Sequence, residues 1–515
     1  MTNKKLFIKN AFSGIFQKII IAILTFFTIP IFISKLGTES YGIFATVSVI
    51  GDLSRIANIG FHIALIKYLS AQGKTKESSI DIIVGLTSMI AIIVPISVLM
   101  IIFNHFVLVH ILNISPSYLA QSRGLYIYLV LANMLLFTGL TFSAMLESLR
   151  LIYISNVLQL VYSIAYWSLI LVALFLGKGI EAIGLMAFLA ALIWFLLVVY
   201  KALMAWGKLS IKGIRFLYWR SVKKQLSYGL QIYASGLMAI GGEPVMKVLV
   251  ANFFGHTYVG FLDIGMRIRN QVVRIFQAAL WPLFQLFSEI KDNDSKARIV
   301  KDIQEKTLLV LLPICFLILF GARSLVSVWI GKDIDIISWS IIYVTIGSLI
   351  GTQTFQAMNN YLGVDHPLIL LVNSTIINVI YLATIVAFRH VLGYDSVFLS
   401  FTIACIASMV LQTYFESRFL GSMIFSTRNQ IRNLFILVGL VSVCGWGLSL
   451  LITSHLALLI VLSVVIPVVC VLLYILLSLL TENDLDRYVG KKNFLKPLYS
   501  LFRLNKVING VWVKK

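Results

Sequence analysis

A polar stripe runs along one side of the apolar segment 258–286, and its side chains have the chemistry to bind a phosphate. The stripe consists of Asp263, Arg267, Asn270, Arg274, Gln277 and Gln285. At about 100° per residue these side chains fall within a narrow arc of an α-helix. A charged side chain at the centre of a bilayer costs at least about 2.5 to 3.5 kcal/mol, so the two arginines are expected to face a wet interior rather than lipid. Their charge predicts an anionic cargo.

Two other apolar segments carry charge in the same way. In segment 41–63, the side chains of Asp52, Arg55, Asn58 and His62 occupy about a third of the helix circumference. This second stripe is the counterpart of the one in 258–286, and both are expected to line one cavity.

Segment 225–250 combines helix-loosening residues with an ion pair. Gly241, Gly242 and Pro244 are expected to interrupt the helix near mid-membrane and to provide a bend for gating. Glu243 and Lys247 stand four residues apart on one face.

The intramembrane cations outnumber the carboxylates. The cations are Lys18, Arg55, Lys247, Arg267, Arg269 and Arg274, against Asp52, Glu243 and Asp263. Structural alternatives exist for each of these residues. Glu243 with Lys247, or Asp263 with Arg267, could be buried pairs that only hold helices together. Lys18 could reach the cytoplasmic interface, Arg269 falls off the stripe, and His62 could be a packed histidine. Pairing leaves a surplus of positive charge, so an anion is expected there.

Composition identifies a polytopic membrane protein. The 515 residues are 59% hydrophobic and 12% charged, whereas soluble domains average about 25% charged residues. The net charge of +21 is expected to lie on the cytoplasmic side of a membrane, so nucleic acid is a poor explanation for it. The four cysteines have no metal-ligand or redox spacing, and no metal, cofactor or cleavable signal peptide is expected.

Hydropathy predicts an all-α membrane protein with about fourteen transmembrane helices. They are placed at 10–33, 41–63, 80–103, 124–146, 155–176, 180–202, 225–250, 258–286, 307–322, 336–358, 368–388, 397–415, 433–453 and 456–480. With both termini in the cytoplasm, 30 of the 42 Lys and Arg residues fall on the inner side, 6 on the outer side and 6 within spans. This asymmetry fixes the predicted orientation.

The chain also repeats itself. Residues 36–43 (LGTESYGI) and 254–261 (FGHTYVGF) each join one helix to the next, and their paired glycines are displaced by 218 positions. Two six-helix halves with the same topology are therefore expected. The predicted parts are an N-lobe at 1–203, a cytoplasmic amphipathic connection at 204–224, a C-lobe at 225–420, a helix pair at 421–481 and a basic cytoplasmic tail at 482–515.

The sequence resembles the Wzx-type O-antigen and polysaccharide repeat-unit flippases of the multidrug/oligosaccharidyl-lipid/polysaccharide exporter superfamily. The resemblance rests on Ile29-Pro30, Leu36-Gly37, Tyr41-Gly42-Ile43, Ile59-Gly60, Gly255, Val259-Gly260 and the run 356–360. It implies two lobes plus a C-terminal helix pair, V-shaped around a central cationic cavity. It also implies that an undecaprenyl-pyrophosphate-linked oligosaccharide moves between leaflets of the bacterial inner membrane by alternating access, drawing on H⁺ or Na⁺. A polysaccharide polymerase and chain-length proteins are the expected partners.

Pyrophosphate accepts the bidentate hydrogen bonds that arginine donates. The predicted head-group contacts are therefore Arg55, Arg267 and Arg274, with Lys18 and Lys247 in secondary roles. The carboxylates Asp52, Glu243 and Asp263 are predicted to restrain the arginines in the empty state or to carry a coupling proton. The polar side chains of Asn58, His62, Asn270 and Gln277 would line the cavity.

Three other functions are alternatives. A flippase for lipid-linked peptidoglycan precursors shares the cationic lumen and is the nearest. A multidrug/cation antiporter of the same superfamily would need an acidic cavity. A membrane enzyme would need a catalytic cluster, and no Ser/His/Asp, phosphate-loop or metal-ligand pattern occurs in the sequence.

Overall fold

The computed structural model describes residues 3–56, 61–210, 214–280, 287, 292–365, 367–421, 428–477 and 479. All regular structure in these residues is helical, which confirms the all-α prediction. The chain forms two compact units, one of Met1–Ile264 with Pro367–Ser400 and the other of Gly265–His366 with Phe401–Lys515. Because these units divide the chain differently from the two predicted lobes, the lobe division stays a prediction.

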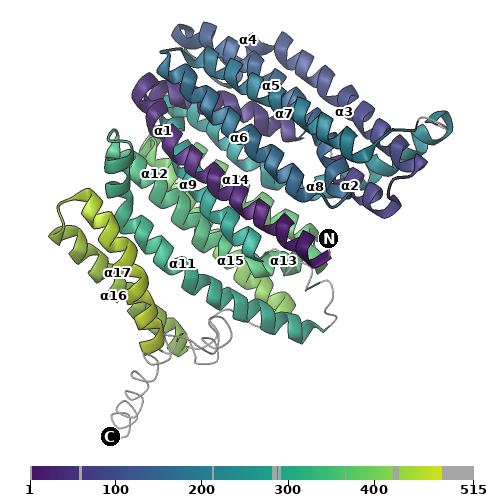
Figure 1. The fold of residues 1–515 in the computed structure, drawn as a ribbon. Helices are drawn as coiled ribbons and strands as arrows, with labels where there is room; N and C mark the ends of the chain where they lie inside the picture. Colours follow the sequence, from purple (N-terminus) through teal and green to yellow (C-terminus); the bar gives the residue numbers. More distant parts are fainter. Residues whose placement is uncertain are drawn as a thin grey trace, which may run out of the picture. The chain divides into compact units, whose positions relative to one another are not determined.

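The first unit is a bundle of long helices (Figure 1). It contains α1 (Asn3–Ile56), α2 (Phe61–Gln72), α3 (Lys76–Ile102), α4 (Asn104–Phe106), the π-helix η1 (Val107–Ile111), α5 (Pro116–Ser148), α6 (Ile152–Phe175), α7 (Ile180–Trp206), α8 (Ile214–Phe254), the start of α9 (His256–Leu280), α14 (Pro367–Leu392) and the start of α15 (Asp395–Leu420). Glycines let α5 and α7 approach closely: a Cβ on Gly184 would lie 2.8 Å from the Leu125 Cα. Trp194 fills the core beside them.

The second unit is built around α11 (Asn293–Trp329). Its other helices are the rest of α9 and α15, α12 (Ile334–Ser348), the π-helix η2 (Leu349–Gln353), α13 (Gln356–Asp365), α16 (Arg428–Leu451) and α17 (His455–Leu476). Helices α16 and α17 form a hairpin that packs on α11 (Figure 1). Leu312 and Leu462 lie in the shared apolar core, and Tyr474 donates a hydrogen bond of 2.7 Å to the Leu309 carbonyl.

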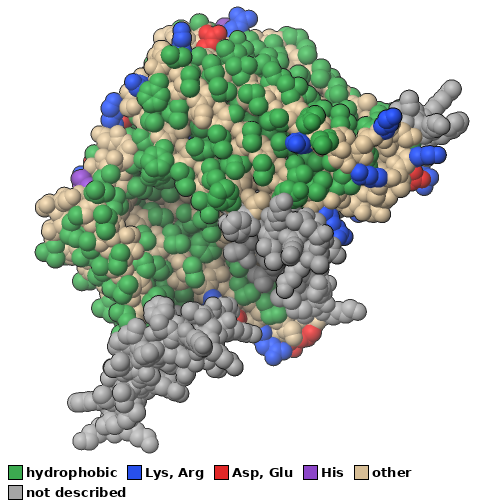
Figure 2. Space-filling model, in the orientation of Figure 1, with side chains coloured by type: hydrophobic (Ala, Val, Ile, Leu, Met, Phe, Trp, Pro, Cys, Tyr) green, Lys and Arg blue, Asp and Glu red, His purple; other side chains and the backbone are tan. Residues whose placement is uncertain are grey.

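Eleven of the described helices are long and apolar enough to cross a membrane. The polar helices α8 and α9 are not among them, and α1 counts as one candidate because it continues through the Gly37 turn. The bundle of the first unit, in the upper part of Figure 2, has a mostly hydrophobic face with Lys and Arg side chains near its two ends. The chain is therefore a multi-pass membrane protein, and the count of fourteen crossings stays a prediction.

One local prediction is corrected. The helix expected to break at Gly241–Pro244 is instead continuous over Ile214–Phe254. Gly242 serves close packing, because a Cβ there would overlap the Asn378 side chain of α14. The amphipathic connection at 204–224 stays a prediction; in the structure α7 continues to Trp206 and α8 begins at Ile214. The predicted tail lies outside the described residues.

The repeated turns pack on each other within the first unit. Gly37 and Gly255 both have left-handed backbone angles, φ 83° and φ 95°, which glycine adopts without strain. A Cβ on Gly42 would overlap the His256 carbonyl, and one on Gly260 would lie 3.1 Å from the Thr38 carbonyl oxygen. Thr38 and His256 are themselves equivalent positions of the repeat, so the contact is reciprocal, as in a two-fold interface.

This packing predicts that Gly42→Ala lowers the thermal unfolding midpoint of the purified protein. The added methyl group would meet a backbone carbonyl that cannot rotate away, and overpacking of this kind costs about 1 to 3 kcal/mol. Gly439→Ala is the control, because nothing lies within 4 Å of a Cβ on that helical glycine. Equal midpoints for Gly42→Ala and the parent protein would contradict the reciprocal contact.

Candidate functional site

A buried ion cluster joins α8 and α9 near the repeated turns. The Lys247 ammonium lies 2.8 Å from Asp263 Oδ1 and 3.1 Å from Glu243 Oε1. The second carboxylate oxygen of Asp263 accepts a hydrogen bond of 2.6 Å from the Tyr41 hydroxyl of α1. Three helices of the first unit are therefore held together by one carboxylate.

The cluster is almost closed to solvent. The Lys247 and Asp263 side chains are 7% and 3% exposed, and the Tyr41 residue is 1% exposed. The Lys247 ammonium therefore contacts two carboxylates in a place shielded from solvent. The role predicted for Asp263 and Glu243, to restrain the arginines or to carry a coupling proton, stays a prediction. A head-group role for Lys247 stays a prediction.

The cluster lies about two helical turns from the end of the bundle. Asp263 follows Gly255 by eight residues, which corresponds to about 12 Å along a helix. Further hydrogen bonds fix the turn itself. His256 Nδ1 lies 3.1 Å from Thr46 Oγ1, and His256 Nε2 lies 3.0 Å from the Asn113 carbonyl oxygen. The Asn252 amide also donates to the Ile111 carbonyl at 2.7 Å. This end of the first unit is closed.

The arginine stripe continues along α9 beyond the cluster. Arg267, Asn270, Arg274 and Gln277 follow Asp263 on the same continuous helix. Asp263 is buried, Arg267 and Asn270 are half-buried, and Arg274 and Gln277 are exposed. The Arg274 Nε–H donates to the Asn270 carbonyl at 2.9 Å. The stripe therefore changes from buried at Asp263 to open at Gln277.

Other predicted residues lie apart from this cluster or outside the described part of the chain. His62 is on α2, with Nε2 4.0 Å from the Glu147 carboxylate. Lys18, Asp52 and Arg55 belong to α1, and the placement of their side chains is not described. Asn58 and Gln285 lie outside the described residues.

Arg269 points off the stripe. It is half-buried, and its Nε atom forms no hydrogen bond with any residue that the structure describes. The described residues also contain no group of three His, Cys, Asp or Glu side chains that could hold a metal ion.

Sequence reasoning missed Tyr41 and Glu147. Tyr41 precedes the second glycine of the first repeated turn. The repeat was the available signal that this turn would pack beside the charged helix that follows the second turn. Glu147 carried no comparable signal. It lies at the end of α5, where it accepts a hydrogen bond of 3.0 Å from the Ser155 hydroxyl of α6.

Comparisons with known proteins agree with this architecture. Residues 7–291 match the family described as polysaccharide biosynthesis protein. The structure of the lipid II flippase MurJ in its inward closed conformation has a TM-score of 0.69 at 14% identity, covering 92% of this chain and 98% of that chain. An inward-facing multidrug resistance MATE family transporter of the MOP superfamily has a TM-score of 0.57 at 15% identity, covering 79% of this chain and 98% of that chain.

The MATE multidrug transporter DinF-BH is also similar. Its TM-score is 0.54 at 16% identity, covering 81% of this chain and 96% of that chain. At such identities the likeness establishes a shared fold. No curated protein sequence matches the chain.

The cluster predicts that Lys247→Met destabilises the protein by about 3 to 5 kcal/mol, because the buried Asp263 carboxylate loses the ammonium group 2.8 Å from it. Adding Asp263→Asn should recover part of that loss by removing the carboxylate charge. The measurement is chemical or thermal unfolding of the purified protein. Arg323→Met is the control, because the Arg323–Asp335 pair is 70% exposed on both sides and such pairs contribute at most about 1 kcal/mol. A double variant no more stable than Lys247→Met would count against the coupling.

Proposed function

The chain belongs to the polysaccharide biosynthesis protein family, and we propose that it moves an undecaprenyl-pyrophosphate-linked oligosaccharide repeat unit from the cytoplasmic to the outer leaflet of the bacterial inner membrane. The cargo would be a precursor of O-antigen or a related surface polysaccharide. The protein is a membrane transporter and not an enzyme. The observation that carries the proposal is the arginine stripe of α9.

The chemistry of the stripe supports a pyrophosphate head group. Arg267 and Arg274 lie seven residues apart on one helix, which is about 10 Å along its axis. Each guanidinium can donate two parallel hydrogen bonds to phosphate oxygens. Asn270 lies between the two arginines and Gln277 follows Arg274. Their amides offer hydrogen-bond donors and acceptors for sugar hydroxyls. The polyprenyl tail would stay in lipid, so only the head group must leave water.

The closed end of the first unit supports an alternating-access mechanism. With the orientation predicted from the basic loops, the Gly37 and Gly255 turns face outward. Release of the cargo on that side requires α1 and α9 to separate there, which breaks the Tyr41–Asp263 hydrogen bond and the Gly42 contact. An anion that engaged Lys247 would compete with Asp263 for the ammonium, so cargo binding would weaken the closed state.

The proposal includes the finer predictions on topology and energy. Fourteen crossings would form two six-helix lobes and a C-terminal pair around a cationic cavity, with both termini in the cytoplasm. Asp52, Glu243 and Asp263 would carry the coupling H⁺ or Na⁺, because a second carboxylate near Lys247 gives a bound proton a favourable site. A polysaccharide polymerase and chain-length proteins would receive the translocated unit.

A lipid-linked peptidoglycan precursor is the second candidate cargo. It is favoured by the structural likeness to lipid II flippase MurJ over 92% of this chain. Both cargoes carry pyrophosphate, so the arginines do not distinguish them. A cationic drug is less favoured, because it would meet two arginines along α9.

We expect Arg267→Ala and Arg274→Ala each to reduce surface glycan at least tenfold without changing the amount of protein in the membrane. Loss of a charge-assisted hydrogen bond costs about 1.5 to 3 kcal/mol, which corresponds to such a factor. Lysine at either position should restore only part of the activity, since it lacks the planar fork. The measurement is glycan display together with the mass of the lipid-linked intermediate that accumulates.

Arg323→Ala, which removes an exposed cation elsewhere, is the matched control. Wild-type display from both alanine variants on α9 would reject the proposed sites. A peptide-bearing intermediate would favour the peptidoglycan precursor, and an oligosaccharide repeat unit the first candidate.

The closed end gives a second test. Thr46 is fully buried beside His256, so Thr46→Cys is expected to resist a membrane-impermeant thiol reagent added from outside. Adding Tyr41→Phe, which removes the bond to Asp263, should raise the labelling rate severalfold by favouring the open state. The parent protein with its four native cysteines is the control. Unchanged labelling in the double variant would show that the hydroxyl does not hold this end closed.

A further inference from the structure

A second polar site lies at the other end of α8, in the first unit. A cavity of about 200 Å³ opens between the α2–α3 loop and the first turns of α8. Its lining residues are Gln72, Glu77, Ile80, Asp81, Arg220, Ser221 and Lys224. Lys224 precedes Lys247 by 23 residues on the same helix, which is about 35 Å, so this cavity is separate from the ion cluster.

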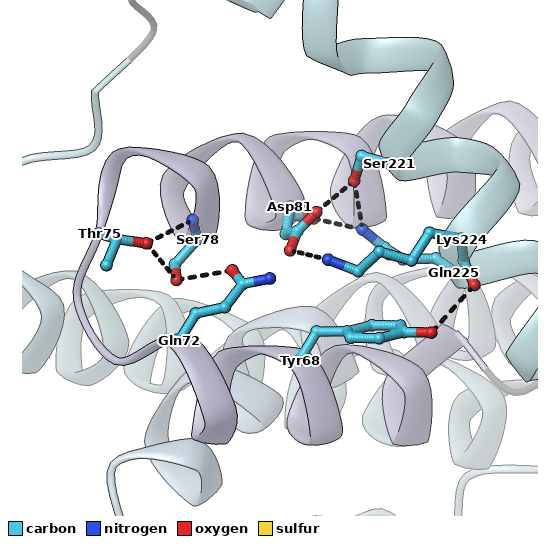
Figure 3. Close-up of polar contacts among 8 residues, drawn as sticks. All are labelled: Tyr68, Gln72, Thr75, Ser78, Asp81, Ser221, Lys224 and Gln225. Carbon is cyan, nitrogen blue, oxygen red and sulfur yellow. Dashed lines mark hydrogen bonds and ion pairs between the residues drawn. The ribbon is translucent and has the colours of Figure 1, made fainter.

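A hydrogen-bond network forms the floor of the cavity (Figure 3). The buried Asp81 carboxylate accepts hydrogen bonds from the Ser221 hydroxyl and, at 2.8 Å, from the Lys224 ammonium. The Gln225 amide donates to the Asp81 carbonyl at 2.9 Å. Lys224 also lies 4.0 Å above the centre of the Tyr68 ring. These contacts fix the shape of the floor before any ligand arrives.

One wall presents an oriented amide. The Thr75 hydroxyl caps α3 by accepting a hydrogen bond of 3.1 Å from the Ser78 backbone. The Ser78 hydroxyl in turn donates to Gln72 Oε1 at 3.0 Å. The Gln72 NH₂ group therefore points away from Ser78 and toward Asp81 (Figure 3). It is a hydrogen-bond donor available to a ligand.

The rim carries one cation and one anion. Glu77 and Arg220 are exposed, and neither forms a hydrogen bond or an ion pair with another residue in the part of the chain that the structure describes. Asp81 and Lys224 already neutralise each other in the floor. The groups of the cavity that are available to a ligand are thus one guanidinium, one amide NH₂ and one carboxylate.

We propose that this cavity binds the phosphoethanolamine head group of a membrane aminophospholipid. The phosphate would accept hydrogen bonds from Arg220 and Gln72, and the ammonium would donate to Glu77. The exposed Trp219 and its neighbour Tyr218 flank the site, and such side chains are enriched at membrane–water interfaces. The cavity is smaller than the roughly 300 to 1,000 Å³ of pockets for drug-sized ligands, as suits a head group whose acyl chains stay in lipid.

The charges disfavour purely anionic and choline head groups. A purely anionic head group would leave Glu77 facing its negative charge. A choline head group carries no N–H, so it cannot donate a hydrogen bond to Glu77. A zwitterion with a primary ammonium satisfies both ends of the rim, and electrostatic complementarity therefore selects it.

The test is a lipid titration of the full-length protein in detergent by native mass spectrometry. Phosphatidylethanolamine, phosphatidylcholine and phosphatidylglycerol with identical acyl chains are compared with soluble phosphoethanolamine. We expect the ethanolamine lipid to bind about tenfold more tightly than the other two lipids, the effect of one charge-assisted hydrogen bond. Glu77→Gln should lower its affinity to that of the choline lipid, and Arg220→Gln should weaken binding of all three lipids.

Both substituted side chains are exposed, so the unfolding midpoints of these variants should equal that of the parent protein. Arg323→Gln, outside the cavity in the second unit, is the matched control and should leave lipid affinity unchanged. Two results would overturn the proposal: equal or tighter binding of phosphatidylglycerol, or undiminished ethanolamine-lipid affinity in Glu77→Gln. If soluble phosphoethanolamine binds as tightly as the lipid, the claim that the ligand is a membrane lipid is wrong.

Discussion

The closed end of the first unit depends on one buried ammonium group. Lys247 lies between Asp263 and Glu243, and the Tyr41 hydroxyl donates a hydrogen bond to Asp263. In a low-dielectric interior, the loss of a partner by any of these groups has a high free-energy cost. Helices α1, α8 and α9 therefore separate only if something else compensates the buried charges. Water, a proton or an anionic cargo can do so. The cluster therefore makes closure of this end sensitive to the chemistry of whatever enters.

Close backbone packing makes this electrostatic contact possible. The Tyr41 hydroxyl reaches Asp263 because Gly42 and Gly260 let the two repeated turns approach each other without intervening side chains. Each second glycine meets the residue that follows the first glycine of the other turn. The internal repeat thus creates a self-complementary contact, and the Tyr41 hydroxyl beside it donates a hydrogen bond to the Asp263 carboxylate.

Helix α8 links two polar sites of different character. Near its C-terminal end, Lys247 forms ion pairs with Glu243 and Asp263 in a buried cluster. Near its start, Lys224 pairs with Asp81 beneath an open cavity. The helix is continuous between them despite Pro244. A lipid held at the start of α8 would brace the helix against which the closed end opens.

The sequence alone determined the all-α membrane class, the approximate positions of most helices and the repeated glycine turns, because hydropathy and glycine spacing are local signals. It also singled out Asp263, Glu243 and Lys247 as charged residues within apolar segments. Tertiary structure alone decided their partners. Tyr41 meets Asp263 across 222 positions of the chain, and Ser221 and Lys224 meet Asp81 across 140 and 143 positions. Periodicity describes which face of a helix a residue occupies, whereas its partner depends on which other helix packs against that face.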